Sequence, residues 1–218
     1  MLTAVDVVLP CLNEAEALPA VLRALPAGCT ALVVDNGSTD GTAAIARGLG
    51  ARVVFEPRPG YGAAVHTGLE QSRTEIVAVL DADGSLDPGA LPELVRVVAE
   101  NRADLAVGRR VPVGRGVQPW HAGAANALLA VLLRRRGLPV HDIAPIRVGR
   151  RAALLGLGVT DRGFGYPLEL LLRAADADWR VHEIDVAYRP RGGGRSKVSG
   201  SLRGTLRAAR DMAAVMRG

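Results

Sequence analysis

Hydrophobic residues follow two periodicities in the first half of the chain. Short apolar runs, typical of strands buried on both faces of a sheet, alternate with segments in which apolar residues recur at helical spacing. The predicted strands are residues 5–9, 31–34, 52–55, 76–80 and 104–107, and the predicted helices are residues 15–25, 41–49, 61–72 and 88–101. This alternation predicts an α/β domain with a mostly parallel sheet flanked by helices.

The second half contains more helix and loop. We predict loops over residues 109–119 and 189–200, helices over residues 120–135, 150–155, 167–175 and 201–216, and a strand over residues 181–188. The final helix is expected to dock against the body, with lying on anionic lipid as the alternative. No linker separates the two parts, so residues 1–108 and 109–218 are predicted to be functional halves of a single domain.

The composition narrows the classes of ligand. A net charge of +5 and a pI of about 10.0 favour anionic ligands. Aromatic residues form only 3% of the chain, so no nucleic-acid partner is expected. Two cysteines form neither a disulfide framework nor a zinc motif, and the N-terminus lacks a signal-peptide pattern, which predicts a cytoplasmic protein. No apolar run is long enough to span a bilayer, so a membrane would be met only at its surface.

Two carboxylates, Asp81 and Asp83, follow the apolar strand of residues 76–80. In a parallel sheet they would lie at the carboxyl edge, where open α/β sheets bind ligands. Like charges so close repel one another unless a cation lies beside them, and a divalent metal that carries phosphates is the obvious candidate. The alternative is an ordinary turn, because Asp-Gly-Ser is common turn chemistry.

Three more polar loops follow predicted strands, at residues 10–14, 35–41 and 57–64. Asp35 directly ends a strand and could accept hydrogen bonds from a base or a ribose. Gly60 and Gly62 form a weak phosphate-binding pattern, because Val65 stands where a last glycine is needed, and they indicate close backbone approach more safely. Together with the Asp81 turn, these loops are predicted to line one crevice.

The ordered set of motifs resembles the family 2 inverting glycosyltransferases of the GT-A fold, a Rossmann-like fold, and spans nearly the whole chain. The second half is similar to the dolichol-phosphate mannose synthase branch. The motifs that carry the resemblance are residues 7–14, 33–42, 60–63 and 81–83, then Asn126, Asp142 and residues 165–169, 183–188 and 191–197. The resemblance implies that the first half of the chain binds the nucleotide sugar. The second half, which is rich in helix and loop, would bind the acceptor.

The resemblance also implies roles for individual residues. Asp83 and Asp81 would hold Mg²⁺ or Mn²⁺ at the donor diphosphate, and Glu169 or Asp142 would be the general base if the acceptor is a hydroxyl. The residues that would bind the nucleotide sugar are Pro10, Asn13, Glu14, Asp35, Gly60, Gly62 and Asp81. Phosphate or acceptor binding would fall to Arg191, Ser196 and Lys197, which is the chain's sole lysine.

We therefore expect a metal-dependent transfer of a hexose, with inversion, from GDP-mannose or UDP-glucose to polyprenyl phosphate at the inner face of the membrane. Two residues depart from the family pattern: Asn36 replaces a frequent second aspartate, and Ser85 replaces a frequent further metal ligand. One alternative is a haloacid-dehalogenase-type phosphatase with Asp81 as nucleophile, although only Lys197 and Asp211 could supply its later motifs. Another is a non-catalytic nucleotide-sugar-binding protein. The sequence does not predict the oligomeric state.

Overall fold

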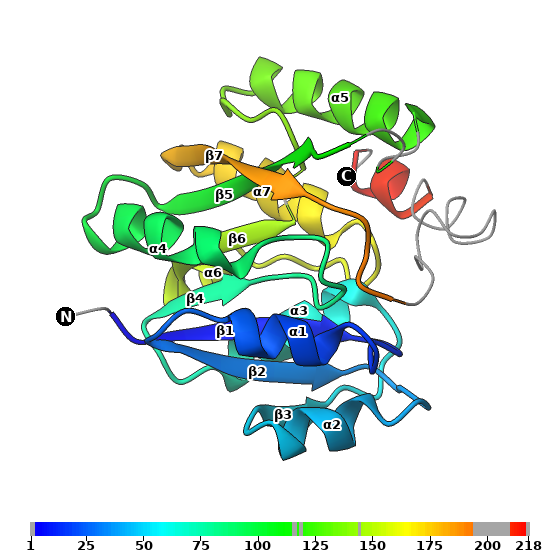
Figure 1. The fold of residues 1–218 in the computed structure, drawn as a ribbon. Helices are drawn as coiled ribbons and strands as arrows, with labels where there is room; N and C mark the ends of the chain where they lie inside the picture. The colour runs from blue at the N-terminus through cyan, green and yellow to red at the C-terminus, as the bar shows by residue number, and fades with distance from the viewer. Residues whose placement is uncertain (1–2, 115–116, 118–119, 144, 194–209, 217–218) are drawn as a thin grey trace.

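A computed structural model describes residues 3–114, 117, 120–143, 145–193 and 210–216. Its core is a seven-stranded sheet with the order β3-β2-β1-β4-β6-β5-β7 (Figure 1). The strands are β1 (Val5–Cys11), β2 (Cys29–Asp35), β3 (Arg52–Phe55), β4 (Ile76–Val79), β5 (Leu105–Pro112), β6 (Ile146–Arg150) and β7 (Val181–Tyr188). All of these strands run in one direction except β6, which is antiparallel to β4 and β5. The expected mostly parallel α/β architecture is confirmed.

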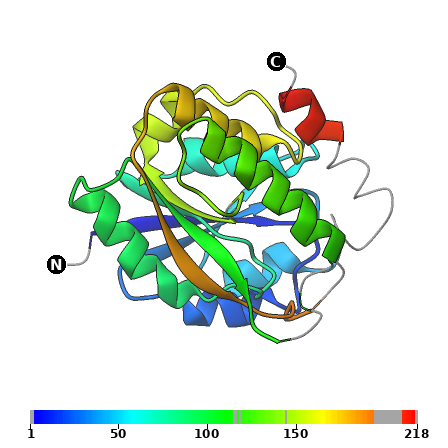
Figure 2. The ribbon, with the colours of Figure 1, turned by 90° about the horizontal axis from the view of Figure 1, so that it is seen from above.

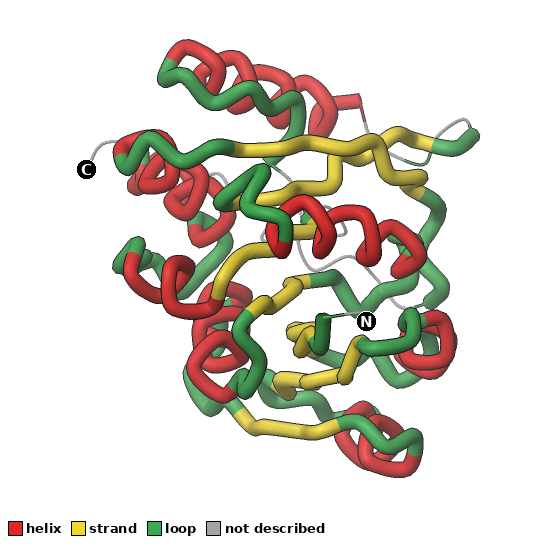
Figure 3. Tube along the Cα trace, turned by 90° about the vertical axis from the view of Figure 1, so that its left-hand side faces the viewer, coloured by secondary structure: helices red, strands yellow, loops and turns green. Residues whose placement is uncertain are grey.

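Helices cover both faces of the sheet, as Figures 2 and 3 show. One face carries α1 (Leu18–Ala24), α2 (Thr42–Gly48), the 3-10 helix η1 (Pro88–Ala90) and α4 (Leu91–Ala99). The other carries α3 (Tyr61–Gln71), α5 (Trp120–Arg135), α6 (Arg151–Gly156) and α7 (Tyr166–Asp176). Each face has its own cluster of buried apolar residues: Val7 and Leu9 of β1 belong to the first and Val8 to the second. Burial on both faces explains why the central strands are continuous apolar runs.

Two predictions about the second half are wrong. Residues 109–112 were expected in a loop, but they extend β5, which pairs with β7 along its whole length. Strand β6 was not predicted, and Arg150, expected to begin a helix, is its last residue. Because β6 lies between β4 and β5, it connects the two halves of the chain into one sheet. The carboxyl ends of the six other strands still share one edge.

The end of the chain packs against the body. Residues 201–209 of the predicted final helix lie outside the described part, but residues 210–215 are helical. Met212, Val215 and Met216 contact the buried cluster that includes α7, which is the docking arrangement expected for this helix. Among the described residues, no helix is both long and apolar enough to cross a membrane.

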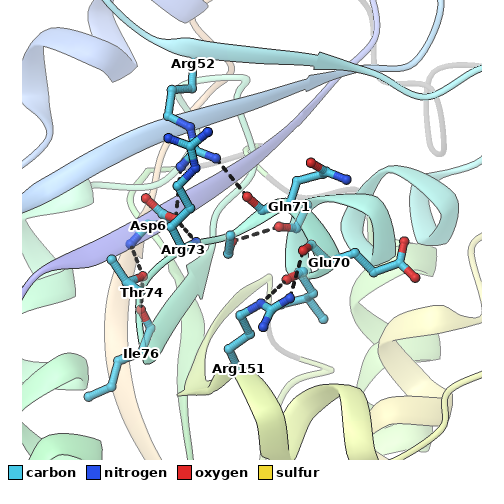
Figure 4. A network of polar contacts seen from close by, with 11 residues as sticks. Asp6, Arg52, Glu70, Gln71, Arg73, Thr74, Ile76 and Arg151 are labelled. Atoms are coloured by element: carbon cyan, nitrogen blue, oxygen red, sulfur yellow. Dashed lines mark hydrogen bonds and ion pairs between the residues drawn. The ribbon is translucent and has the colours of Figure 1, made fainter.

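At the amino-terminal edge of the sheet, two arginines bind the last turn of α3 (Figure 4). Arg52 bonds to Asp6 at 3.1 Å and to the carbonyl of Gln71 at 2.8 Å. Arg151 donates to the carbonyls of Leu69 and Glu70, which also belong to the last turn of α3. These carbonyls have no partner within the helix, so the guanidinium groups satisfy them and bind α3 to β3 and α6.

Close packing of α3 on β1 generates a stability prediction. A Cβ atom at Gly68 would lie 2.2 Å from Cγ1 of Val8, whereas one at Gly48 would meet nothing within 4 Å. We expect Gly68→Ala to lower the free energy of unfolding by about 1–3 kcal/mol through overpacking. The control Gly48→Ala should leave stability unchanged or raise it by up to about 1 kcal/mol, because alanine is the better helix former. Urea denaturation measures both, and equal stability of the two variants would contradict this packing.

Candidate active site

The turn after β4 presents the two aspartates at the carboxyl edge. Gly84 has a φ of +73°, a left-handed conformation that favours glycine, and the amide of Ser85 donates to Oδ1 of Asp83 at 2.9 Å. The segment is therefore a genuine turn, as the alternative interpretation of the sequence held. Turn chemistry and a ligand site do not compete here, because the turn itself holds the carboxylate of Asp83 at the edge of the sheet.

Asp81 lies in an unfavourable environment for a negative charge. Burial, and then the charge of Asp83, raise its pKa to about 6. Three groups oppose this shift: the charges of Arg147, which is 2% exposed, and of Arg110, and then the hydroxyl of Tyr61, which lies 3.3 Å from Oδ1 of Asp81. The same hydroxyl lies 3.2 Å from Nη1 of Arg147. Neither Tyr61 nor Arg147 was singled out in the sequence.

Asp83 and Glu14 share one arginine. Nη1 of Arg191 lies 2.7 Å from Oδ2 of Asp83, and its Nη2 lies 2.8 Å from Oε1 of Glu14. The chain around Arg191 is also bound to the turn, because the amide of Gly192 donates to the carbonyl of Asp83 at 2.8 Å. Thus the segment after β7 crosses the aspartate turn and brings a cation to two of the predicted site carboxylates.

The loops after β1 and β2 are bonded to one another. Oδ1 of Asn13 accepts from the amide of Thr39 at 2.8 Å, and the amide of Asn13 donates to Oγ of Ser38 at 2.9 Å. Asp35 accepts from the amide of Ser38 at 3.0 Å and is 7% exposed. Pro10 lies beside Val34 in the paired strands. Four predicted nucleotide-binding residues therefore lie close together: Pro10 and Asp35 at the ends of paired strands, and Asn13 and Glu14 in the loop after β1.

Gly60 and Gly62 allow close approach, as expected, but to the protein itself. A Cβ on Gly60 would lie 2.1 Å from the carbonyl oxygen of Arg162, and one on Gly62 would also meet Arg162. The amides of Gly62 and Ala63 donate to the carbonyls of Gly163 and Arg162. Because these bonds occupy the N-terminal amides of α3, the glycines do not cradle a phosphate in this conformation.

Asn36 has a structural role that an aspartate could not fill. Its Nδ2 donates to the carbonyls of Glu56 and Arg58 at 2.9 and 2.7 Å, and its Oδ1 accepts from the amide of Gly60 at 2.8 Å. A carboxylate has no hydrogen to donate. Asn36, which departs from the family pattern, therefore joins the end of β2 to the loop before α3.

The carboxylates of Asp81 and Asp83 fit a magnesium or manganese ion whose other ligands come from a bound molecule. Mg²⁺ is commonly bound by one or two carboxylates together with phosphate oxygens and water, and Asp81 and Asp83 supply two carboxylates. In the described part of the chain, no cluster of three or more His, Cys, Asp or Glu side chains could hold a metal ion unaided. Ser85 adds a hydroxyl at most, so phosphates would have to complete the coordination.

Asp142, predicted as a candidate base, is paired with Arg110. The Arg110 side chain contacts both oxygens of Asp142, at 2.6 and 2.8 Å, and the Arg110 amide donates to Oδ2 at 2.8 Å. Asp142 is 1% exposed. Arg110, another residue that the sequence did not single out, also lies 5.7 Å from the ring centre of Tyr188. This arrangement stabilises the ionised carboxylate and holds it away from solvent.

Glu169, the other candidate base, is bonded just as fully. Its oxygens accept from the amides of Thr160 and Asp161 at 2.9 and 2.6 Å, and Arg173 lies 2.7 Å away. Burial alone would raise the pKa of Glu169, but these amides and then Arg173 lower it from its ordinary value. A carboxylate with a lowered pKa is a weak proton acceptor. Ser196 and Lys197 lie outside the described residues.

Comparison with known proteins agrees with this geometry. The model of the family described as "Glycosyl transferase family 2" matches residues 6–156. The chain belongs to glycosyltransferase family 2. It is 62% identical over 209 residues to an uncharacterized glycosyltransferase of Mycobacterium tuberculosis (strain ATCC 25618 / H37Rv), covering 95% of each chain. It is 34% identical over 221 residues to polyprenol monophosphomannose synthase of Mycolicibacterium smegmatis, covering 89% of this chain and 81% of the relative.

Solved structures share the fold of this glycosyltransferase. Glucosyl-3-phosphoglycerate synthase from Mycobacterium tuberculosis, in complex with Mn²⁺, uridine diphosphate and glucosyl-3-phosphoglycerate, superposes with a TM-score of 0.76 and 25% identity. The match covers 98% of this chain and 78% of that one. The expected GT-A fold is confirmed, and family membership removes the phosphatase alternative: the Asp81 turn belongs to a transferase.

The cost of burying Asp81 gives a pH-dependent prediction. Its pKa is raised from the ordinary 3.8 to about 6, so the folded protein binds this proton more tightly than the unfolded chain does. This contribution favours folding at low pH and is lost as the pH rises through 6. At pH 7.5 we expect Asp81→Asn to be more stable than the wild type by up to about 3 kcal/mol, since one pKa unit is worth about 1.4 kcal/mol.

Thermal unfolding between pH 5 and 7.5 measures the effect. The stability gain of Asp81→Asn should shrink as the pH falls. The exposed residue Asp176 on α7 provides the control, because Asp176→Asn should differ little from the wild type at any pH in this range. A gain that stays constant with pH would exclude the charge of Asp81 as its source.

Proposed function

We propose that this glycosyltransferase moves a hexose, with inversion, from a nucleotide-diphosphate sugar to a polyprenyl phosphate. One observation carries the choice of acceptor: arginines already neutralise Asp142 and Glu169, the two carboxylates that were candidates for a general base. A hydroxyl acceptor needs a base to take its proton, whereas a phosphate acceptor arrives as an anion and does not.

The donor would bind at the carboxyl edge of β1, β2 and β4. Asp35 and the loop of Asn13 are suited to the nucleoside, and Asp83 and Asp81 to a divalent ion on the diphosphate. Mg²⁺ or Mn²⁺ would stabilise the negative charge that develops on the leaving diphosphate. The solved glucosyl-3-phosphoglycerate synthase complex with Mn²⁺ and uridine diphosphate supports this assignment.

Phosphate contacts would come from the segment after β7. Arg191 lies against Asp83, so a small movement of its guanidinium would bring it to a diphosphate held at the same carboxylate. Ser196 and Lys197 follow within six residues and would add a hydroxyl and an ammonium group. Inversion requires the acceptor to attack in line from the opposite side of the anomeric carbon, and these groups would hold the leaving side in place.

A lipid acceptor would be met at the inner face of the membrane, with the enzyme in the cytoplasm. The net charge of +5 favours approach to anionic lipid. The name of the 34% identical relative, polyprenol monophosphomannose synthase, supports an acceptor of this class. A soluble phosphorylated acceptor is the second candidate, since a glucosyl-3-phosphoglycerate synthase structure was solved in complex with phosphoglyceric acid.

Transfer assays with radiolabelled GDP-mannose and UDP-glucose test the proposal. We expect Mn²⁺- or Mg²⁺-dependent labelling of polyprenyl phosphate and none of 3-phosphoglycerate. Asp83→Ala should lower kcat/KM about 100-fold or more, because it removes charge stabilisation of the leaving group. Lys197→Ala should lower it about tenfold, as expected for a charged hydrogen bond. The control Asp176→Ala should transfer normally.

Different results would lead to different conclusions. Labelling of 3-phosphoglycerate alone would replace the lipid acceptor with the soluble one. Full activity of Asp83→Ala would remove the metal role of this carboxylate. Donor binding without transfer to either acceptor class would favour the non-catalytic alternative.

A phosphate acceptor needs no general base, and this gives a prediction about Glu169. Removing a general base costs about 10²–10⁴-fold in rate. Glu169→Gln keeps the shape of the side chain, so we expect kcat within about threefold of the wild type and an unchanged pH profile if the acceptor is a phosphate. A loss of 100-fold together with a loss of the acidic limb of the profile would instead identify Glu169 as a base and the acceptor as a hydroxyl. Circular dichroism checks that the variant is folded.

A further inference from the structure

Strand β6 carries a buried arginine where an apolar residue would be expected. Its neighbours Ile146 and Val148 are fully buried in one apolar cluster, whereas Arg147 points to the opposite face and is 2% exposed. In the sheet Arg147 lies beside Val79, two residues before Asp81. Burying a guanidinium group has a large desolvation cost, and an apolar side chain of similar volume would avoid it. The position therefore suggests a use for the charge.

The hydrogen bonds of Arg147 have a fixed direction. Its Nη1 donates to the hydroxyl oxygen of Tyr61 at 3.2 Å. A guanidinium has no acceptor, so the tyrosine oxygen must accept there and its single proton is left for another partner. That partner is Oδ1 of Asp81, at 3.3 Å. Arg147, Tyr61 and Asp81 therefore form a chain of two hydrogen bonds, which we call the relay. It runs from β6 through the first residue of α3 to the turn after β4.

The relay distinguishes the two oxygens of Asp81. Oδ1 accepts from Tyr61, whereas Oδ2 accepts no hydrogen bond from the described part of the chain. A hydrogen bond to one oxygen restrains the rotation of the carboxylate and so favours one direction for its second oxygen. The positive charge of Arg147 also offsets part of the repulsion between Asp81 and Asp83. These are the properties that a ligand carboxylate requires of its supporting residues.

We propose that Tyr61 and Arg147 are positioning residues that hold Asp81 in the orientation in which its free oxygen meets the metal-bound diphosphate of the donor. The inference rests on the proposed function, because it assumes that Asp81 faces the donor. It assigns the pair no contact with the substrate. Their effect is exerted through Asp81, and it should be seen in metal-dependent nucleotide binding without any acceptor present.

A matched pair of tyrosines provides the test. Tyr61→Phe removes the oxygen that joins Arg147 to Asp81. Tyr166, on α7, is fully buried and its hydroxyl has no hydrogen-bond partner in the described structure, so Tyr166→Phe is the control. The probes are UDP and GDP, titrated calorimetrically with and without Mn²⁺. We expect Tyr61→Phe to weaken binding in the presence of Mn²⁺ about tenfold, the size of a lost hydrogen bond to a charged group. Binding without Mn²⁺ should change less than twofold.

Substitutions of Arg147 extend the test. Arg147→Met should show the same loss in Mn²⁺-dependent binding, and Arg147→Lys should restore part of it because an ammonium group can still donate to Tyr61. In transfer assays the donor KM should rise about tenfold while kcat changes little. Thermal unfolding identifies any variant that is not folded, and Tyr61→Phe keeps the conclusion testable because it is nearly isosteric.

Several outcomes overturn the inference. If Tyr61→Phe and Tyr166→Phe bind UDP and GDP with Mn²⁺ as the wild type does, the relay positions nothing. If Tyr61→Phe weakens binding equally with and without Mn²⁺, its role is structural. If the wild type binds neither nucleotide with Mn²⁺, the proposed function itself fails, which is a result distinct from a failure of the relay alone.

Discussion

The constraint on which this structure depends is the neutralisation of carboxylates gathered at one edge of a sheet. Parallel strands bring their carboxyl ends together, and the loops that follow them carry acidic side chains. Each buried carboxylate needs a cation or hydrogen-bond donors to remain ionised. Arginine fills this role for Asp83 and Glu14, which share Arg191, for Asp142 with Arg110 and for Glu169 with Arg173. Asp81 differs, because none of the described arginines forms an ion pair with it: Arg147 and Arg110 act on it only through their charge, and its hydrogen bond comes from Tyr61.

The first half of the fold could be predicted because its signals are local. An apolar run between turn residues identifies a strand that is buried on both faces, and the alternation with helices predicts parallel pairing. Strand β6 gave no such signal. Its sequence, Ile-Arg-Val-Gly-Arg, includes a glycine and two arginines. Its place between β4 and β5 depends on pairing with residues far away in the sequence, such as Arg150 with Ile76, which are 74 residues apart. The end of β5 was missed for a similar reason, since Arg109 and Arg110 are typical of a loop until β7 pairs with them.

The candidate site was predictable to the extent that it follows from strand ends. Asp35, Asp81 and Asp83 each come just after an apolar run, so their common edge follows from the parallel topology. Their partners do not follow. Tyr61 and Arg147 are 86 residues apart, and Arg191 is 177 residues from Glu14. Nothing in the local sequence distinguishes Tyr61 and Arg147 from ordinary core residues. Glu14 and Arg191 were predicted as site residues, but their contact with one another was not. Tertiary contacts also decide that the amides beside Gly62 bind a protein carbonyl and not a phosphate.

The two edges of the sheet differ in how fully their polar groups are bonded within the described protein. At the amino-terminal edge, Arg52 and Arg151 satisfy the last carbonyls of α3, and the bonding is complete within the protein. At the carboxyl edge, Asp81 keeps an oxygen that accepts nothing from the described chain, and its charge lies beside that of Asp83. Such a site lowers the stability of the folded protein, and binding of a cation with its phosphates there would stabilise it by mass action. The function we propose therefore places the ligand where the charges of the described fold are least balanced.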